Sequence, residues 1–201
     1  MRAFIVASES AVASGDFLLD DFPGTSGRLD VLARCIRAAL LVSHGVRRDV
    51  RLYLVLGGGP SAPITVRISG DSAKFLRPDE RAAAVLLKKV LAEGMGATAS
   101  FADVRPGVAL ARGGVDVVVA ELGDARRYVL EEGAPDVRSV PKWDDSVAFL
   151  LGDHRGIAPT SRAAFGEATA VGLGPLSLHT EDAIAVASNE LDRASPVLGS
   201  R

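Results

Sequence analysis

The sequence predicts an α/β protein with a mostly parallel sheet and helices on both faces. Short runs of consecutive apolar residues, typical of strands buried on both sides, recur along the chain. Between them lie longer stretches in which apolar residues are three or four positions apart, which is the helical period. Alternation of such strands and helices is typical of a parallel sheet with helices packed on each face.

The first half of the chain contains three predicted strands, at residues 3–7, 50–56 and 64–68. A helix is predicted after the first strand, and its core face consists of Leu29, Leu32, Ile36, Leu40 and Ser43. Asp30 and Arg34 fall on its polar face, four positions apart, where they can pair in solvent. Pro78 opens a second helix that runs to about Glu93, because proline fits a first helical turn.

The second half begins with a region of weaker signals. Residues 108–111 form a weak strand, residues 115–122 a short helix or strand, and residues 127–130 a short strand. The last third is clearer, with strands at 147–151 and 170–173, a helix from Thr160 and a closing helix at 180–193. We expect one domain over residues 1–201, because a single core suits a chain of this length.

Composition excludes several classes of protein. Hydrophobic residues make up 48% and charged residues 24%, which indicates a folded chain. No apolar run approaches the roughly 18 residues of a membrane span, so we expect a cytoplasmic protein. Cys35 is the only cysteine, and the three histidines are far apart in sequence. We therefore expect neither a disulfide nor a metal site.

The net charge of −2 argues against a surface that coats nucleic acid broadly. Charge is nevertheless uneven, because residues 28–51 contain six arginines and only two aspartates. This segment is either a phosphate-binding patch or an ordinary solvated helix face, and the sequence leaves both interpretations open.

Two loops that each follow a late strand, residues 151–157 and 172–179, contain glycines and histidines. Ligands of open α/β sheets bind at the carboxyl ends of strands, so the loops predict a pocket, although ordinary strand-to-helix turns have the same spacing. The next helix has Thr180 as its expected N-cap, with Glu181 and Asp182 in the first turn. These acids would repel a phosphate but tolerate a cation such as the sulfonium of S-adenosylmethionine.

Five segments in chain order carry a resemblance to a known family. They are PGTSGRLDVLARC at 23–35, SHGVRRDV at 43–50, PDER at 78–81, LGDH at 151–154 and GPLSLH at 174–179. Together they resemble the tRNA pseudouridine-54 N1-methyltransferases of the SPOUT superfamily. The resemblance extends from the first strand to the last helix, with a looser match over residues 94–140.

The resemblance implies a homodimer that acts on tRNA, with a C-terminal trefoil knot, an exception to the rule that chains do not knot. It also implies that S-adenosylmethionine binds in the loops of the knot. The residues expected around this cofactor are Leu130, Gly152, Gly174, Pro175, Leu176, Ser177, Leu178, His179 and Ala183. No metal is implied.

One position departs from the family pattern. Where archaeal members have His-Ala-Asn-His-Cys, this chain has His179-Thr180-Glu181-Asp182-Ala183, so a role of that cysteine cannot carry over. For the reaction, the hypothesis is that the base flips into the pocket and loses its N1 proton. Arg28 and Arg34 are the candidates for phosphate contact and charge stabilisation, and Asp30 is the candidate orienter or base.

Three alternatives remain at this point. One is a SPOUT methyltransferase acting on another RNA site, such as a ribosomal pseudouridine or a ribose hydroxyl. Another is a non-catalytic RNA-binding dimer, which the acidic Glu181 and Asp182 and the missing cysteine favour. The third is a generic nucleotide-binding domain, which would bind ATP or NAD instead of a methyl donor.

Overall fold

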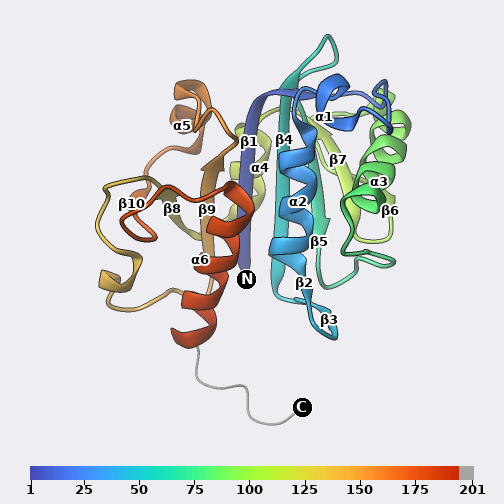
Figure 1. Ribbon diagram of the computed structural model, residues 1–201. Helices are drawn as coiled ribbons and strands as arrows, with labels where there is room; N and C mark the ends of the chain where they lie inside the picture. Colours follow the sequence, from blue (N-terminus) through green and yellow to red (C-terminus); the bar gives the residue numbers. More distant parts are fainter. Residues whose placement is uncertain (195–201) are drawn as a thin grey trace.

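The computed structural model describes residues 1–194, and its centre is an eight-stranded sheet (Figure 1). The strand order is β10-β8-β9-β1-β4-β5-β7-β6. These strands are β1 (Arg2–Val12), β4 (Val50–Gly58), β5 (Ile64–Ser69), β6 (Ala102–Arg105), β7 (Val108–Arg112), β8 (Arg126–Leu130), β9 (Val147–Gly152) and β10 (Thr169–Val171). A separate small hairpin consists of β2 (Leu41–Val42) and β3 (Gly45–Val46).

The sheet has a parallel part and an antiparallel part. From β10 to β4 every pairing is parallel, and β1 lies between β4 and β9 with Ile5 opposite both Tyr53 and Leu150. From β4 to β6 every pairing is antiparallel. The predicted mostly parallel α/β class is therefore confirmed. The carboxyl ends of all five parallel strands lie at one edge of the sheet.

Helices cover both faces of the sheet, and each face has its own apolar core. In Figure 1, α2 (Leu29–Leu40) and α6 (Thr180–Ala194) lie in front of the sheet, α3 (Glu80–Glu93) lies beside α2, and α4 (Val115–Leu122) lies behind. The front core includes Phe4 and Phe149, whose rings stack with centroids 5.6 Å apart. The rear core contains Ile5 and Leu150, which alternate with them along the same strands, and the side chains of α4 and α5 (Pro159–Phe165). Short turns of helix complete the fold at α1 (Phe22–Thr25), Gly94–Gly96 and Val137–Ser139.

Several expectations about local structure were wrong in detail. The first long helix ends at Leu40, and the chain enters the β2–β3 hairpin, so Ser43 is not helical. Pro78 precedes α3, whose N-cap is Asp79, because the Asp79 side chain accepts a hydrogen bond from the Ala82 N–H at 2.8 Å. Strand β6 was missed because its exposed, polar sequence lacks an apolar run.

The ambiguous segment at 115–122 is a helix, α4. Within residues 1–194, no helix is long and apolar enough to cross a membrane.

The last helix is held in place by ion pairs at its C-terminal end. Asp192 of α6 accepts hydrogen bonds from Arg47 at 2.7 and 2.9 Å and pairs with Arg2 at the start of β1. Burial raises the pKa of Asp192, but hydrogen bonds from Arg47 and Arg2 outweigh this effect, so its pKa lies below the usual value. A lowered carboxylate pKa stabilises the folded chain above the unfolded-state pKa, and this contribution is lost as the pH falls.

We expect Asp192→Asn to lower the free energy of unfolding at pH 7 by about 1 kcal/mol or less, since the pair is partly solvated. The deficit should shrink as the pH falls below 3.8, the ordinary value for this group, because wild-type Asp192 then becomes protonated as well. Urea unfolding at pH 7 and at pH 3 measures the difference in the free energy of unfolding between the variant and the wild type at each pH. Asp124→Asn, an exposed aspartate outside any ion pair of residues 1–194, is the control. A deficit of equal size at both pH values would contradict this account.

Candidate active site

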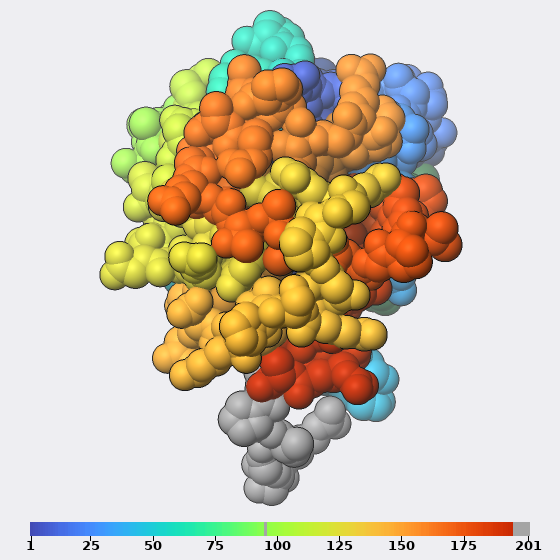
Figure 2. All heavy atoms as spheres, turned by 90° about the vertical axis from the view of Figure 1, so that its left-hand side faces the viewer, coloured from blue at the N-terminus to red at the C-terminus, as the bar shows by residue number. Residues whose placement is uncertain are grey.

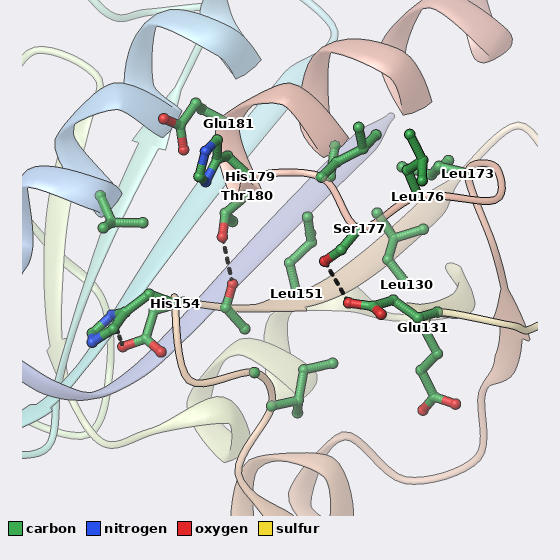
Figure 3. Close-up of a pocket in the computed structure, with 18 of the residues that line it drawn as sticks. Leu130, Glu131, Leu151, His154, Leu173, Leu176, Ser177, His179, Thr180 and Glu181 are labelled. Atoms are coloured by element: carbon green, nitrogen blue, oxygen red, sulfur yellow. Dashed lines mark hydrogen bonds and ion pairs between the residues drawn. The ribbon is translucent and has the colours of Figure 1, made fainter.

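A cavity of about 760 Å³ lies at the carboxyl ends of β8, β9 and β10, bounded by the first turns of α2 and α6 (Figure 3). Its volume lies within the ordinary range of small-ligand pockets. One part of its wall is apolar, and another part carries charged groups of both signs. The lining residues include Val31, Leu130, Leu151, Ile157, Leu173, Leu176 and Leu178, with Arg28, Arg34, Glu131, Glu132, His154, Arg162, His179 and Glu181.

The loop after β9 needs a glycine at its first position. An added Cβ at Gly152 would lie 2.0 Å from the carbonyl carbon of Gly156 and 2.5 Å from the Ile157 nitrogen. These are main-chain atoms, so they cannot move aside without reshaping the loop. Gly156 itself has φ +82°, a left-handed conformation that favours glycine. The turn therefore brings the main chain tightly along the cavity floor.

Thr180 ties this loop to the last helix. Its hydroxyl donates a 2.8 Å hydrogen bond to the Gly152 carbonyl, as Figure 3 shows. The expectation that Thr180 is an N-cap was wrong, because Thr180 is already in α6 and the His179 carbonyl accepts the first helical bond, from Ala183. The hydroxyl thus fixes the start of α6 against the end of β9.

The loop at residues 172–179 offers main-chain donors to a ligand. Ser177 donates a 2.5 Å hydrogen bond to Glu132, which joins this loop to the end of β8 (Figure 3). Within the described residues, the N–H groups of Leu176, Ser177 and Leu178 donate no hydrogen bond. Unpaired donors in a wall of a cavity are suited to the acceptor atoms of a bound heterocycle or carboxylate.

Arg28 reaches the cavity from an unusual backbone conformation. It has φ 69° and ψ 30°, in the left-handed region, and follows Gly27, which also has positive φ. An added Cβ at Gly27 would lie 1.9 Å from the Ser10 carbonyl oxygen. A left-handed arginine costs on the order of 1 kcal/mol or more, and such strain is concentrated at functional sites.

Asp30 holds Arg28 and Arg34 together. It accepts hydrogen bonds from Arg28 at 2.9 and 3.2 Å and from Arg34 at 3.0 Å. Burial raises the pKa of Asp30, but the two guanidinium groups outweigh this effect and hold it below the usual value. Of the two interpretations that the sequence left open, a solvated helix face is wrong for Asp30, because only 5% of its side chain is exposed.

Arg34 continues the network to two other helices. Its Nε donates a 2.6 Å hydrogen bond to Glu181 of α6, and Nη1 donates one of 3.3 Å to Glu80 of α3. Burial lowers the pKa of Arg34, but its three carboxylate partners raise it well above the usual value, so the guanidinium stays charged. Glu181 Oε2 is buried and lacks a hydrogen-bond partner within residues 1–194. The acidic start of α6 is thus balanced by Arg34.

The structure brings most of the predicted site residues together. Arg28, Arg34, Leu130, Gly152, Gly174, Leu176, Ser177, Leu178, His179 and Ala183 all line the cavity. Pro175 and Asp30 do not line it, and Asp30 acts on it through the two arginines. Sequence reasoning missed Glu131, Glu132 and Arg162. The two glutamates directly follow the strand predicted at 127–130, so the same rule about carboxyl ends could have found them.

Another buried carboxylate, that of Asp153, lines the cavity. Asp153 accepts a 2.5 Å hydrogen bond from Ser8 of β1 and a 2.8 Å bond from the Arg155 N–H. These contacts fix the β9 loop against β1. Within residues 1–194 no cluster of three histidine, cysteine, aspartate or glutamate side chains could hold a metal ion.

Together these features define an α/β protein with a partly apolar candidate ligand pocket across two glycine-containing loops at the carboxyl ends of its strands. A family model described as SAM-dependent RNA methyltransferase matches residues 1–195. The chain therefore belongs to this family of S-adenosylmethionine-dependent RNA methyltransferases.

Curated relatives match nearly the whole chain. Proteins named tRNA (pseudouridine(54)-N(1))-methyltransferase are 40% identical in Thermococcus gammatolerans, 39% in Halobacterium salinarum and 37% in Methanococcoides burtonii. Each alignment covers 96% of this chain and 96 or 97% of the relative. The family predicted from the five sequence motifs is confirmed.

A solved structure shares the fold. The crystal structure of Archaeoglobus fulgidus Nep1 bound to S-adenosylhomocysteine matches with a TM-score of 0.64 at 14% identity, over 96% of this chain and 98% of that chain. The likeness shows that the two chains share one fold.

We expect Gly152→Ala to weaken S-adenosylmethionine binding at least tenfold, because the added methyl group collides with the main chain of the β9 loop. Overpacking of this kind costs about 1–3 kcal/mol. Isothermal titration calorimetry measures the affinity. Gly45→Ala, where a Cβ meets nothing within 4 Å, is the matched control and should bind as the wild type does. Unchanged affinity of Gly152→Ala for S-adenosylmethionine would show that this loop is not part of the cofactor site.

Proposed function

We propose that this enzyme transfers a methyl group from S-adenosylmethionine to N1 of pseudouridine 54 in the T-loop of tRNA. The observation that carries the proposal is that one cavity joins the two cofactor loops to the Arg28–Asp30–Arg34 network. The relatives named for this reaction, at 37 to 40% identity over 96% of the chain, support the choice of substrate.

The cavity fits S-adenosylmethionine. Its apolar wall suits the adenine ring, and the unpaired N–H groups at Leu176, Ser177 and Leu178 suit the acceptors of that ring or of the methionine carboxylate. Glu131 and Glu132 suit the positive charges of the ligand. When bound, S-adenosylmethionine supplies an electrophilic methyl group on its sulfonium.

In this reaction the residues of the chain must allow one proton to leave the base and must stabilise one transient negative charge on it. N1 of pseudouridine carries a hydrogen, which it must lose when it gains a methyl group. Loss of this proton leaves negative charge on the base, and a nearby guanidinium stabilises such charge. This proton is only weakly acidic, and a guanidinium beside the base makes it easier to lose, so that it can leave to solvent through the open cavity.

Arg28 is the better placed of the two arginines for this role. Its Nε and Nη2 donate to Asp30, while Nη1 donates no hydrogen bond within the described residues. Arg34 is committed to Asp30, Glu80 and Glu181. We therefore assign Arg28 as the catalytic residue, and Asp30 and Arg34 as residues that position it. Both oxygens of Asp30 already accept hydrogen bonds, which argues against its use as the base.

The trefoil knot is also part of this proposal. The segment after β10 is bonded to the loop that joins β8 to β9, since Gly172 donates to Pro135 and accepts from Val137, each at 2.8 Å. In Figure 2 the segment after β8, in yellow, lies across the orange-red segment after β10, which emerges on both sides. This crossing supports threading of the chain end through the loop. The homodimer and the cytoplasmic location remain predictions.

We expect transfer of labelled methyl to a tRNA with pseudouridine at position 54 and none to a matched tRNA with uridine there, because uridine has a glycosidic bond at N1. Scintillation counting with purified full-length protein measures both. Equal transfer to the two tRNAs would place the methyl group at another site and contradict the proposed substrate.

We expect Arg28→Ala to lower the rate of methyl transfer by about 100-fold while the affinity for S-adenosylmethionine stays the same, since loss of one charge-stabilising donor costs this much. Single-turnover kinetics measures the rate. Arg138→Ala, a mostly exposed arginine at the opposite edge of the sheet, is the control.

The positioning role of Asp30 is tested in the same assay. If it acts only through Arg28, then Asp30→Asn should slow the wild-type enzyme but not the Arg28→Ala enzyme. An Arg28→Ala enzyme with undiminished transfer would remove Arg28 from catalysis.

A further inference from the structure

The loop between β5 and α3 displays an aromatic side chain to solvent. Phe75 is 95% exposed, the largest exposed fraction among the large apolar side chains of residues 1–194. Its backbone has φ 61°, in the left-handed region that a bulky side chain avoids. Exposure of an aromatic ring and left-handed backbone are both unfavourable, and no contact within the described residues offsets them. Strain of this kind is typical of a residue that meets a ligand.

The rest of the loop is firmly attached, so Phe75 is held in this exposed position. Ala73 is buried at 4% exposure, and Leu76 packs against the front core. The Ala73 N–H donates a 2.8 Å hydrogen bond to the Ser69 carbonyl. Arg48 donates to the carbonyls of Gly70 and Asp71 at 3.2 and 3.1 Å. The two sides of the loop are anchored, and only its tip projects.

The charges at the tip favour an anionic partner. Lys74 and Arg77 flank Phe75, are exposed, and form no hydrogen bond or ion pair within residues 1–194. Of the neighbouring acids, Asp79 caps α3, Glu80 pairs with Arg34 at 3.3 Å, and Asp71 accepts a hydrogen bond from the Ser72 hydroxyl at 2.7 Å. Two cations without a partner in residues 1–194 therefore lie within two positions of one exposed ring in the chain.

The loop begins at the edge of the sheet opposite the cavity, because Gly70 donates to Val50 at the start of β4, and it ends at α3, whose first residue contacts a cavity-lining arginine. Glu80 follows the loop by a few residues and contacts Arg34, which lines the cavity. An RNA whose target base occupies the cavity would continue past the rim of that cavity. A strand that continues from the cavity past Arg34 and Glu80 to the start of α3 would meet the Phe75 loop.

We propose that Phe75, Lys74 and Arg77 form a subsite for the RNA substrate, in which an unpaired base stacks on the Phe75 ring and adjacent phosphates pair with the two cations. One exposed ring between free cations is typical of single-stranded nucleic acid recognition, in which stacking is independent of sequence. A second protein copy would be expected to cover a broader apolar patch. The proposal deepens the function given above, and it rests on RNA being the substrate.

The test measures tRNA affinity by filter binding with full-length protein, without a methyl donor. We expect Phe75→Ala to weaken binding about tenfold, in line with the loss of one base stack. Phe75→Leu, which keeps an apolar side chain but no ring, should be similarly weak, and Phe75→Trp should bind as the wild type does. Leu18→Ala, another exposed apolar residue at 65% exposure, is the matched control and should not change affinity.

Two further readouts separate binding from folding. Phe75→Gly should raise the midpoint of urea unfolding, because it relieves the left-handed strain, and yet weaken tRNA binding like Phe75→Ala. Lys74→Ala with Arg77→Ala should reduce the slope of log affinity against log salt by about 0.7 for each lost phosphate contact. Affinity for S-adenosylmethionine should stay constant in all variants.

The outcomes distinguish this inference from the proposed function. Wild-type affinity in Phe75→Ala, with methyl transfer to pseudouridine tRNA intact, would overturn the subsite and leave the function in place. Weakened binding in Phe75→Ala and Phe75→Leu, with recovery in Phe75→Trp, would support the subsite even if no methyl reached position 54. A change from dimer to monomer in sedimentation of Phe75→Ala would overturn it in favour of a contact between two copies of the chain.

Discussion

Asp30 is a buried carboxylate that holds two arginines, and through Arg34 this group joins three helices around the cavity. Arg34 contacts Asp30 on α2, Glu80 on α3 and Glu181 on α6. A buried charge is stable only when it is paired and hydrogen-bonded, so each member requires the others. The network therefore fixes the position of α6, whose first turn forms one wall of the cavity, and leaves Arg28 with a free donor.

The parallel part of the sheet determines where this network acts. Strands β8, β9 and β10 end at the same edge of the sheet. Two hydrogen bonds join the segments that follow them: the Thr180 hydroxyl donates to the Gly152 carbonyl, and the Ser177 hydroxyl donates to the Glu132 carboxylate. Segments far apart in sequence thus enclose one space. Glycine at 152 is required because the main chain of its own loop occupies the place of a side chain.

Within residues 1–194, two residues other than glycine have positive φ, and each directly precedes or lies a few positions before a helix of the front face. Arg28 is left-handed at the start of α2, and Phe75 is left-handed before α3. In each case the neighbouring residues are held by hydrogen bonds or packing. The fold therefore imposes the strained backbone conformation and leaves one side chain projecting from it. Arg28 thereby lines the cavity, and for Phe75 we have proposed contact with an RNA base.

The α/β class, the positions of most strands and helices, the two loops of the site and the family were all predictable from the amino-acid sequence. Apolar runs such as residues 3–7 and 147–151 are buried on both faces of the sheet, and this pattern is local, so it is readable without coordinates. The order of the strands was not readable, and neither was the antiparallel part formed by β5, β7 and β6, because strand pairing joins distant segments.

Only the tertiary structure decided the environment of the charged groups. Asp30 and Arg34 are four positions apart on a helix, a spacing that suits a solvated pair equally well. Packing of α6 against α2 buries Asp30 and adds Glu181 as a partner, which no property of residues 28–34 reveals. The left-handed backbone conformations of Arg28 and Phe75 could not be predicted from the sequence for the same reason. At a residue other than glycine, such a conformation is imposed by contacts with other parts of the chain.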